Sequence, residues 1–182
     1  MDTNTRKVTL PATDSAAATV PFRELFDREF GYVCRALRRL GVRAGDLEDV
    51  AQELFVAVHR ALPSYDRSRD LRPWLFSFAF RFAANYRRLA RHAGYASDGP
   101  FRTMSAEDHP DAEARDMVLR ALEALDFDRR DVIVMHDLEG FSAPEIAAQL
   151  GIPLNTVYSR LRLARGEFRA AVHALRAAGG PS

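Results

Sequence analysis

Apolar side chains recur every three or four positions through residues 22–40, and Gly41 follows the last of them. This spacing gives an α-helix one apolar face, and glycine is common just past a helix end. The same pattern returns in later segments: residues 46–62, 72–91, 114–125, 129–138 and two short stretches on either side of Gly151. Because no sustained strand alternation and no repeat of fixed period occurs, the sequence predicts an all-α fold.

Residues 93–111 read AGYASDGPFRTMSAEDHPD and interrupt the helical pattern. Gly, Pro, Ser and Asp without an apolar period are typical of a flexible connection. A chain of 182 residues with 47% hydrophobic content can bury one core or two small ones. We therefore predict two small helical domains, residues 21–92 and 113–178, joined by a flexible linker at 93–112 and preceded by a flexible segment at 1–20.

Charge is unevenly distributed, although the formal net charge is only +1. Residues 22–92 contain 14 arginines against 9 acidic residues, whereas residues 93–118 contain 2 against 6. From residue 152 onward there are five arginines and one glutamate. Two basic regions are thus separated by an acidic stretch, and this asymmetry suggests a nucleic-acid partner.

The single cysteine, Cys34, excludes an intramolecular disulfide and fits a reducing compartment. The first twenty residues lack the apolar core of a signal peptide, and no run of about eighteen apolar residues follows. We expect a cytoplasmic protein without membrane insertion.

Residues 72–91 read RPWLFSFAFRFAANYRRLAR, in which phenylalanines alternate as they would on a strand. The alanines and the placement of Pro73 in a first turn favour a helix instead. A helical projection places Trp74 and five other apolar residues on one core-facing sector: Leu75, Phe78, Phe82, Tyr86 and Leu89. Phe76 and Phe80 fall on the opposite side, among arginines.

Aromatic rings interleaved with arginines outside a core suit single-stranded nucleic acid, because rings stack on bases and guanidiniums bind phosphates. The alternative is that Phe76 and Phe80 pack on a neighbouring helix or on the linker. The sequence alone leaves both interpretations open.

Residues 46–55 read DLEDVAQELF and open with acids that suit a helix N-terminus. The polar side collects Glu48, Asp49, Gln52 and Glu53, with Val56 in their midst. Phosphates would be repelled by this face, so a binding role requires a basic protein partner. The alternative is a solvated face with one isolated valine.

Residues 142–165 read SAPEIAAQLGIPLNTVYSRLRLAR and predict a helix-turn-helix. Ser142 and Glu145 form a capping box, and Gly151 makes the turn. The second helix presents amides, hydroxyls and guanidiniums that can read major-groove edges and hold phosphates. Helix pairs with glycine turns also occur in proteins that bind no DNA.

An enzymatic function is weakly supported by the sequence. The five histidines show no H-x-x-x-H spacing and no pairing with cysteine, and Cys34 is interpreted as a small core residue. We expect no catalytic residue, no metal and no cofactor.

Together the three motifs resemble, in their order, a bacterial extracytoplasmic-function sigma factor of the sigma-70 family, over about residues 22–171. The resemblance implies two helical domains, similar to sigma regions 2 and 4, that bind core RNA polymerase and promoter DNA. It implies that the D-x-E-D-x-x-Q-E-x-F helix grips the polymerase clamp through Asp46, Glu48, Asp49, Gln52, Glu53, Phe55 and Val56.

The same resemblance assigns the melted minus-ten strand to the helix at residues 72–91, through Trp74, Phe76, Phe80, Arg81, Arg87, Arg88 and Arg91. It assigns the minus-thirty-five element to the second helix of the helix-turn-helix, through Asn155, Thr156, Tyr158, Ser159, Arg160, Arg162 and Arg165. The family's usual I-A-R-N after W-L is replaced here by F-A-F-R, residues 78–81. The promoter sequences that relatives bind therefore do not predict those that this chain binds.

The implied function is to direct polymerase to promoters for transcription initiation. The alternative is a free-standing helix-turn-helix repressor or activator, which needs no polymerase-gripping helix. We expect a monomer when free, and the resemblance allows an anti-sigma factor as a further partner.

Overall fold

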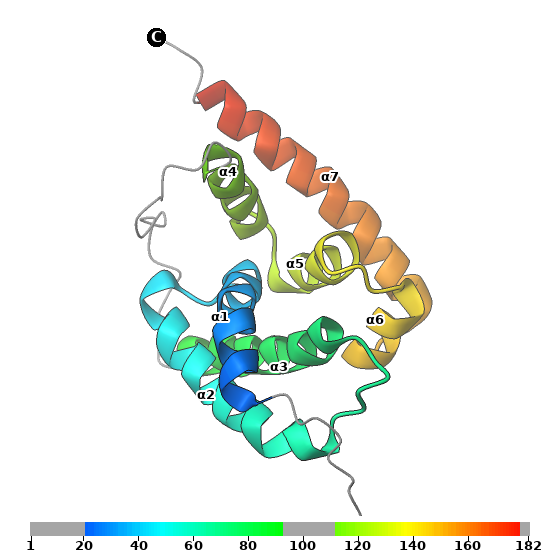
Figure 1. Cartoon of the computed structure of the whole chain (residues 1–182). Helices are drawn as coiled ribbons and strands as arrows, with labels where there is room; N and C mark the ends of the chain where they lie inside the picture. Colours follow the sequence, from blue (N-terminus) through cyan, green and yellow to red (C-terminus); the bar gives the residue numbers. More distant parts are fainter. Residues whose placement is uncertain (1–20, 93–111, 179–182) are drawn as a thin grey trace, which may run out of the picture.

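The computed structural model describes residues 21–92 and 112–178, and every regular element within these two stretches is helical. The first stretch contains α1 (Phe22–Arg39), η1 (Ala44–Asp46), α2 (Leu47–Ala61), η2 (Leu62–Ser64) and α3 (Leu71–His92). The second contains α4 (Ala112–Glu123), α5 (Phe127–Ile133), a π-helical turn η3 (Val134–Leu138), α6 (Ala143–Leu150) and α7 (Leu154–Ala178). The all-α prediction is confirmed (Figure 1).

Helices α1, α2 and α3 pack against one another around a shared apolar core. Leu37 and Leu40 at the end of α1 are fully buried, as are Leu54 and Val58 of α2. Gly41 ends α1 with φ of 94°, a backbone conformation that side chains with a Cβ rarely adopt. The predicted helix and its glycine stop are therefore both confirmed.

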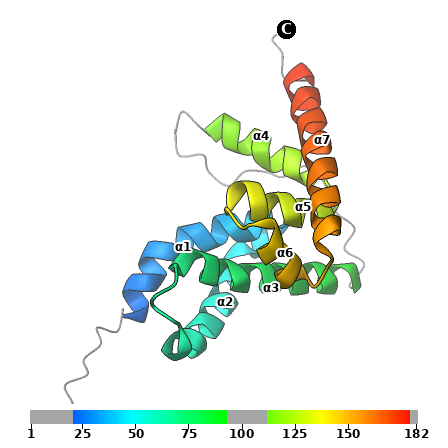
Figure 2. The same ribbon diagram turned by 90° about the vertical axis from the view of Figure 1, so that its right-hand side faces the viewer.

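The α4–α7 half is organised along the long helix α7, against which α4, α5 and α6 pack (Figure 2). Ser142 and Glu145 form the predicted capping box, in which the Glu145 carboxylate accepts hydrogen bonds from the Ser142 backbone N–H (2.8 Å) and hydroxyl (2.6 Å). Gly151 is left-handed with φ of 65°, so the chain reverses directly into α7. Val157 and Leu161 bury the inner face of α7.

The two halves pack directly against each other, which a description as two domains on a linker does not include. Figures 1 and 2 both place α5 and α6 beside α3. The rings of Phe76 in α3 and Phe141 before α6 lie 5.4 Å apart between centroids. At the edge, the Tyr32 hydroxyl donates to the Glu139 carboxylate at 2.5 Å, and Arg39 donates to the same group at 3.0 Å.

Gly41 also lies at this contact. A Cβ built on it would stand 2.8 Å from Nη1 of Arg130 and 2.9 Å from Cε1 of Phe127, both in α5. Such distances are shorter than real Cβ contacts. The turn after α1 therefore approaches α5 as closely as it does because residue 41 has no side chain.

The described helices include none that is both long enough and apolar enough to cross a membrane. The predicted linker and the predicted N-terminal segment lie outside the described residues, apart from the linker's last position, Ala112, which begins α4. The predicted domain boundaries therefore remain a prediction.

Candidate functional site

One face of α2 carries an exposed row of acidic and amide side chains. Glu48, Asp49, Gln52 and Glu53 are all exposed, and Val56 beside them is 52% exposed. Glu48 and Asp49 lie in the first helical turn, where carboxylates interact favourably with the helix dipole. This surface, which we call the acidic row, suits a basic protein partner and repels phosphates.

Two residues predicted with this row lie elsewhere. Phe55 is only 2% exposed, and its ring lies 4.8 Å from that of Phe26. Phe55 is therefore no exposed member of the row: its ring supports the row from inside the core and reaches the surface only in the wall of the adjoining groove, so its predicted contact with polymerase stays a prediction. Asp46 is half-buried and accepts hydrogen bonds from the Tyr86 hydroxyl (2.5 Å) and from Nε of Arg43 (3.2 Å).

A surface groove of about 590 Å³ runs beside the acidic row, and its lining includes aromatic side chains from both α1 and α2. The lining residues are Phe22, Phe26, Gln52, Phe55, Val56, His59 and Arg60. A partner could therefore place an apolar side chain in the groove while its basic groups meet the acidic row. The aromatic contribution of α1 to this surface was not predicted from the sequence.

Helix α3 exposes three of its predicted DNA-binding arginines: Arg81, Arg88 and Arg91. Each is hydrogen-bonded to its own helix. Arg81 donates to the Ser77 carbonyl at 3.1 Å, and Arg88 donates to the Asn85 side chain at 2.8 Å. These contacts hold the guanidiniums close to the helix while they stay accessible to phosphates.

Phe80 is half-buried and packs partly against the core, so part of this residue remains at the surface. Trp74 is also half-buried and packs between Tyr65 (4.6 Å between centroids) and Phe78 (4.9 Å). The two aromatics are thus partly supported by the core, and of the two only Phe80 lies in the arginine-rich part of the helix.

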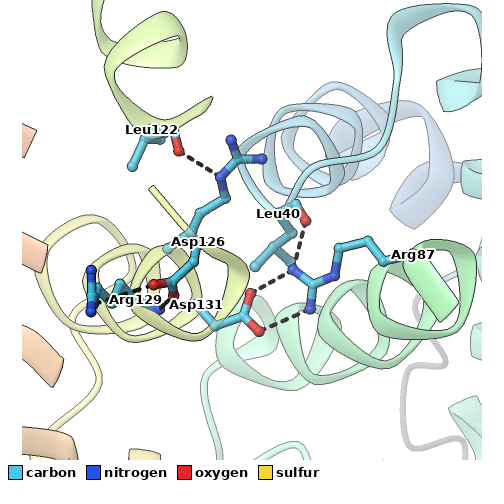
Figure 3. A network of polar contacts seen from close by, with 7 residues as sticks. Leu40, Arg87, Leu122, Asp126, Arg129 and Asp131 are labelled. Carbon is cyan, nitrogen blue, oxygen red and sulfur yellow. Dashed lines mark hydrogen bonds and ion pairs between the residues drawn. The ribbon is translucent and has the colours of Figure 1, made fainter. Parts of the chain in front are cut away.

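Phe76 and Arg87 are buried, contrary to the expectation that both belong to an accessible DNA-binding face. Phe76 has no exposed surface, because α3 meets the α4–α7 half at this point. Arg87 is 7% exposed and donates two hydrogen bonds to Asp131 of α5, at 2.7 and 2.8 Å, and a third to the Leu40 carbonyl at 2.8 Å (Figure 3). The helical projection had placed Phe76 on the side away from the core, and it could not show that the α4–α7 half covers that side.

The beginning of α7 forms the outward face of the helix-turn-helix. Asn155, Tyr158, Ser159 and Arg162 are exposed, while Thr156 is half-buried. Arg162 makes no hydrogen bond or ion pair with any residue that the structure describes. This set can donate to and accept from base edges in a major groove.

The other two arginines of this face are paired with carboxylates of the same half. Arg160 is half-buried and donates to Asp128 at 2.6 Å. Arg165 donates to both oxygens of Asp137, at 2.6 and 2.9 Å, and these bonds lower the pKa of the Asp137 carboxyl. A phosphate that binds either arginine must therefore compete with a carboxylate.

Three acidic residues that bind arginines were not predicted from the sequence. They are Asp131, which binds Arg87, Asp137, which binds Arg165, and Glu139, which binds Arg39. Asp131 and Asp137 belong to a segment that was interpreted only as an apolar helix. A signal was present, because an aspartate inside an apolar run is buried only when it is paired.

Residues 25–93 match the family model for Sigma-70 region 2, and residues 115–167 match that for Sigma-70, region 4. The chain is similar to the RNA polymerase sigma factor NccH of Alcaligenes xylosoxydans xylosoxydans, with 30% identity over 184 residues, 90% of this chain and 96% of that protein. It is also similar to the ECF RNA polymerase sigma-E factor of Escherichia coli K12, with 33% identity over 138 residues, 68% of this chain and 72% of that protein.

The chain belongs to the extracytoplasmic-function branch of the sigma-70 family. As a sigma factor it directs RNA polymerase to promoters for transcription initiation. The alternative of a free-standing helix-turn-helix regulator is not favoured, because the match includes region 2 as well as region 4.

Two solved structures of sigma factors resemble this sigma factor along most of its length. RpoE of Bartonella quintana, solved with the anti-sigma factor NepR, has a TM-score of 0.66 and 20% identity, and the match covers 84% of this chain and 96% of that one. CnrH, solved with the cytosolic domain of CnrY, has a TM-score of 0.54 and 30% identity, covering 84% and 88%. The likeness to RpoE bears on the fold alone.

Proposed function

We propose that this sigma factor distributes its contacts over three surfaces. The acidic row of α2 and the adjoining aromatic groove bind a basic surface of core RNA polymerase. The arginines of α3, together with Phe80, bind the melted minus-ten strand. The first turns of α7, from Asn155 to Arg162, read the minus-thirty-five element in the major groove.

The observation that carries this assignment is the separation of surface types by helix. Carboxylates and one exposed valine lie on α2, exposed arginines lie on α3, and a mixed hydrogen-bonding set lies at the start of α7. A polymerase surface, a single strand and a duplex groove require these three chemistries respectively.

The proposal includes no catalytic centre, since the sigma factor acts by positioning polymerase and DNA. Its place of action is the cytoplasm, where polymerase and promoters are located. RpoE was solved with the anti-sigma factor NepR, and CnrH was solved with the cytosolic domain of CnrY. We extend this to the present chain and propose that a protein of the anti-sigma type binds it as well.

In vitro transcription with bacterial core polymerase and a genomic promoter library tests the proposal. We expect start sites that require the added chain and share an upstream and a downstream element. Transcripts indistinguishable from those of core polymerase alone would contradict it. Arg162→Ala serves as a matched variant, which should alter preference only within the upstream element.

A further inference from the structure

The contact between the two halves occupies residues that the proposed function assigns to DNA. Arg87 is bound to Asp131 in a two-pronged ion pair, and Phe76 packs on Phe141 with no surface left exposed (Figure 3). A melted strand cannot reach either side chain while α5 lies against α3. The described arrangement and full engagement of α3 by DNA therefore exclude each other.

We infer that this arrangement is a closed form of the chain, held by the Arg87–Asp131 ion pair, and that promoter DNA competes with Asp131 for Arg87. The inference rests on the proposed role of Arg87 in DNA binding. The closed form itself does not depend on that role, because it is a property of the free chain.

The chemistry of the pair supports competition. A guanidinium binds a carboxylate and a phosphate in the same forked geometry, with two parallel N–H donors. Asp131 uses one N–H from each terminal nitrogen of Arg87, at 2.7 and 2.8 Å. The carboxylate thus occupies the donors that a backbone phosphate would use.

A second contact between the two halves places its donors and its acceptor on the same sides as the Arg87–Asp131 pair does. Tyr32 and Arg39 of α1 donate to Glu139, which follows η3. The Arg87 guanidinium also lies over the Phe127 ring, 4.7 Å from its centroid. In the Arg39–Glu139 and Arg87–Asp131 ion pairs the α1–α3 half supplies the cation and the α4–α7 half supplies the carboxylate, so acidic residues of one half take the place of phosphates on the other.

Burial explains why one substitution should open the chain. Removing one partner of a buried pair leaves the other charge without compensation in a site from which water is excluded. If the pair lay inside a single domain, the unpaired Arg87 could regain contact with water only when that domain unfolds. Here Arg87 regains water when the two halves separate. Asp131→Asn should therefore shift the chain from closed to open while each half keeps its helices.

The test uses the full chain with fluorescent labels at Glu24→Cys and His173→Cys, two exposed helical positions in different halves, in a Cys34→Ala background. We expect Asp131→Asn to lower energy transfer between the labels in the absence of DNA and polymerase. Asp128→Asn is the matched control, since Asp128 lies in the same helix, loses the same charge and pairs with Arg160 of its own half. It should leave the transfer unchanged.

Helicity and thermal unfolding show whether Asp131→Asn remains folded. Glu139→Gln is a second variant at the edge of the same interface, and it should lower the transfer in the same direction. Unchanged transfer in the folded Asp131→Asn chain, or in Glu139→Gln should Asp131→Asn unfold, would overturn the closed form.

Affinity for a single-stranded oligonucleotide, measured on the free chain, tests the competition separately. Opening should raise the affinity of Asp131→Asn on the order of tenfold, a typical size for coupling between two sites. Arg87→Ala should abolish this gain. Opening without tighter DNA binding would leave the closed form standing and would overturn both the competition and the assignment of Arg87 to DNA.

Discussion

The guanidinium of Arg165 in α7 donates hydrogen bonds to both carboxylate oxygens of Asp137 in η3, at 2.6 and 2.9 Å. Nδ1 of His136 lies 2.7 Å from the same carboxylate. The positive charge of Arg165, three positions after Arg162 in the same helix, is thus partly neutralised by a carboxylate of its own half. Asp137 consequently influences how strongly Arg165 can hold a phosphate.

Asp137→Asn should strengthen binding of promoter duplex without changing its preference for sequence. The substitution removes a negative charge near the DNA and leaves Arg165 free for a phosphate, a contact that carries no sequence information. The measurement is affinity against salt for a promoter and a scrambled duplex. A steeper salt dependence for both is expected, whereas a change confined to the promoter would show that Asp137 contributes to base reading.

The pH dependence of this pair has a definite sign. Hydrogen bonds from Arg165 lower the pKa of Asp137 in the folded chain. A carboxyl with a lowered folded-state pKa contributes stability above its unfolded pKa of about 3.9, and that contribution disappears as pH falls through the folded value. NMR titration should show the pKa of Asp137 rising in Arg165→Ala. No movement would show that the pair is absent in solution.

Arg162 and Arg165 should respond differently to truncation. Arg162 is exposed and has no partner among the described residues, so Arg162→Ala should reduce discrimination at one or two base pairs, at about 1–3 kcal/mol for a bidentate contact. Arg165→Ala should lower affinity for all sequences and flatten the salt dependence. Binding to a randomised upstream element separates the two, and identical profiles would refute the assignment.

Phe55 and Glu53 of α2 should differ in the property that their substitution changes, which is stability for Phe55 and polymerase binding for Glu53. Phe55→Ala removes a buried ring and should lower the free energy of unfolding by about 3–5 kcal/mol. Glu53→Arg changes an exposed member of the acidic row, so it should weaken binding to core polymerase and leave unfolding nearly unchanged. Chemical denaturation and a polymerase pull-down measure the two effects. Normal polymerase binding by folded Glu53→Arg would show that the acidic row is a solvated face without a role in binding.

Phe80 and Phe76 provide a matched pair on α3. Phe80→Ala should reduce open-complex formation about tenfold, through loss of a stacking contact of about 1–3 kcal/mol, and low salt should not restore it. Phe76→Ala should instead lower the melting temperature, since its ring is fully buried. A pre-melted promoter serves as control because it still offers a base to stack. If Phe80→Ala mainly destabilises the fold, Phe80 belongs to the core.

The sequence predicted the helices well because helical spacing, the glycine stops at Gly41 and Gly151, and the Ser142 capping box are local signals. The region 4 core at Val157 and Leu161 followed from the same spacing. Local signals did not reveal which surfaces the fold covers. Leu89 was assigned to the core and is 53% exposed, whereas Phe76 was placed outside it and is buried.

In the candidate site, too, the sequence predicted the features that depend on one helix and not those that depend on contact between distant helices. The acidic row is exposed as its helical spacing indicated, since exposure there depends on one helix and its immediate neighbours. The burial of Arg87 depends on Asp131, which lies 44 positions away in sequence. Such a pairing is a property of tertiary contact, and no periodicity within either helix could have revealed it.

The missing side chain at Gly41 has a consequence for how sigma factors of this kind can be compared. The space that a Cβ would need is already occupied by Arg130 and Phe127 of the other half. A related chain with a larger residue at this turn must shift the ends of these two side chains or the halves themselves, and it must also place that residue at a positive φ. Glycine at this position in a relative therefore marks a turn that can lie as close to α5 as it does here.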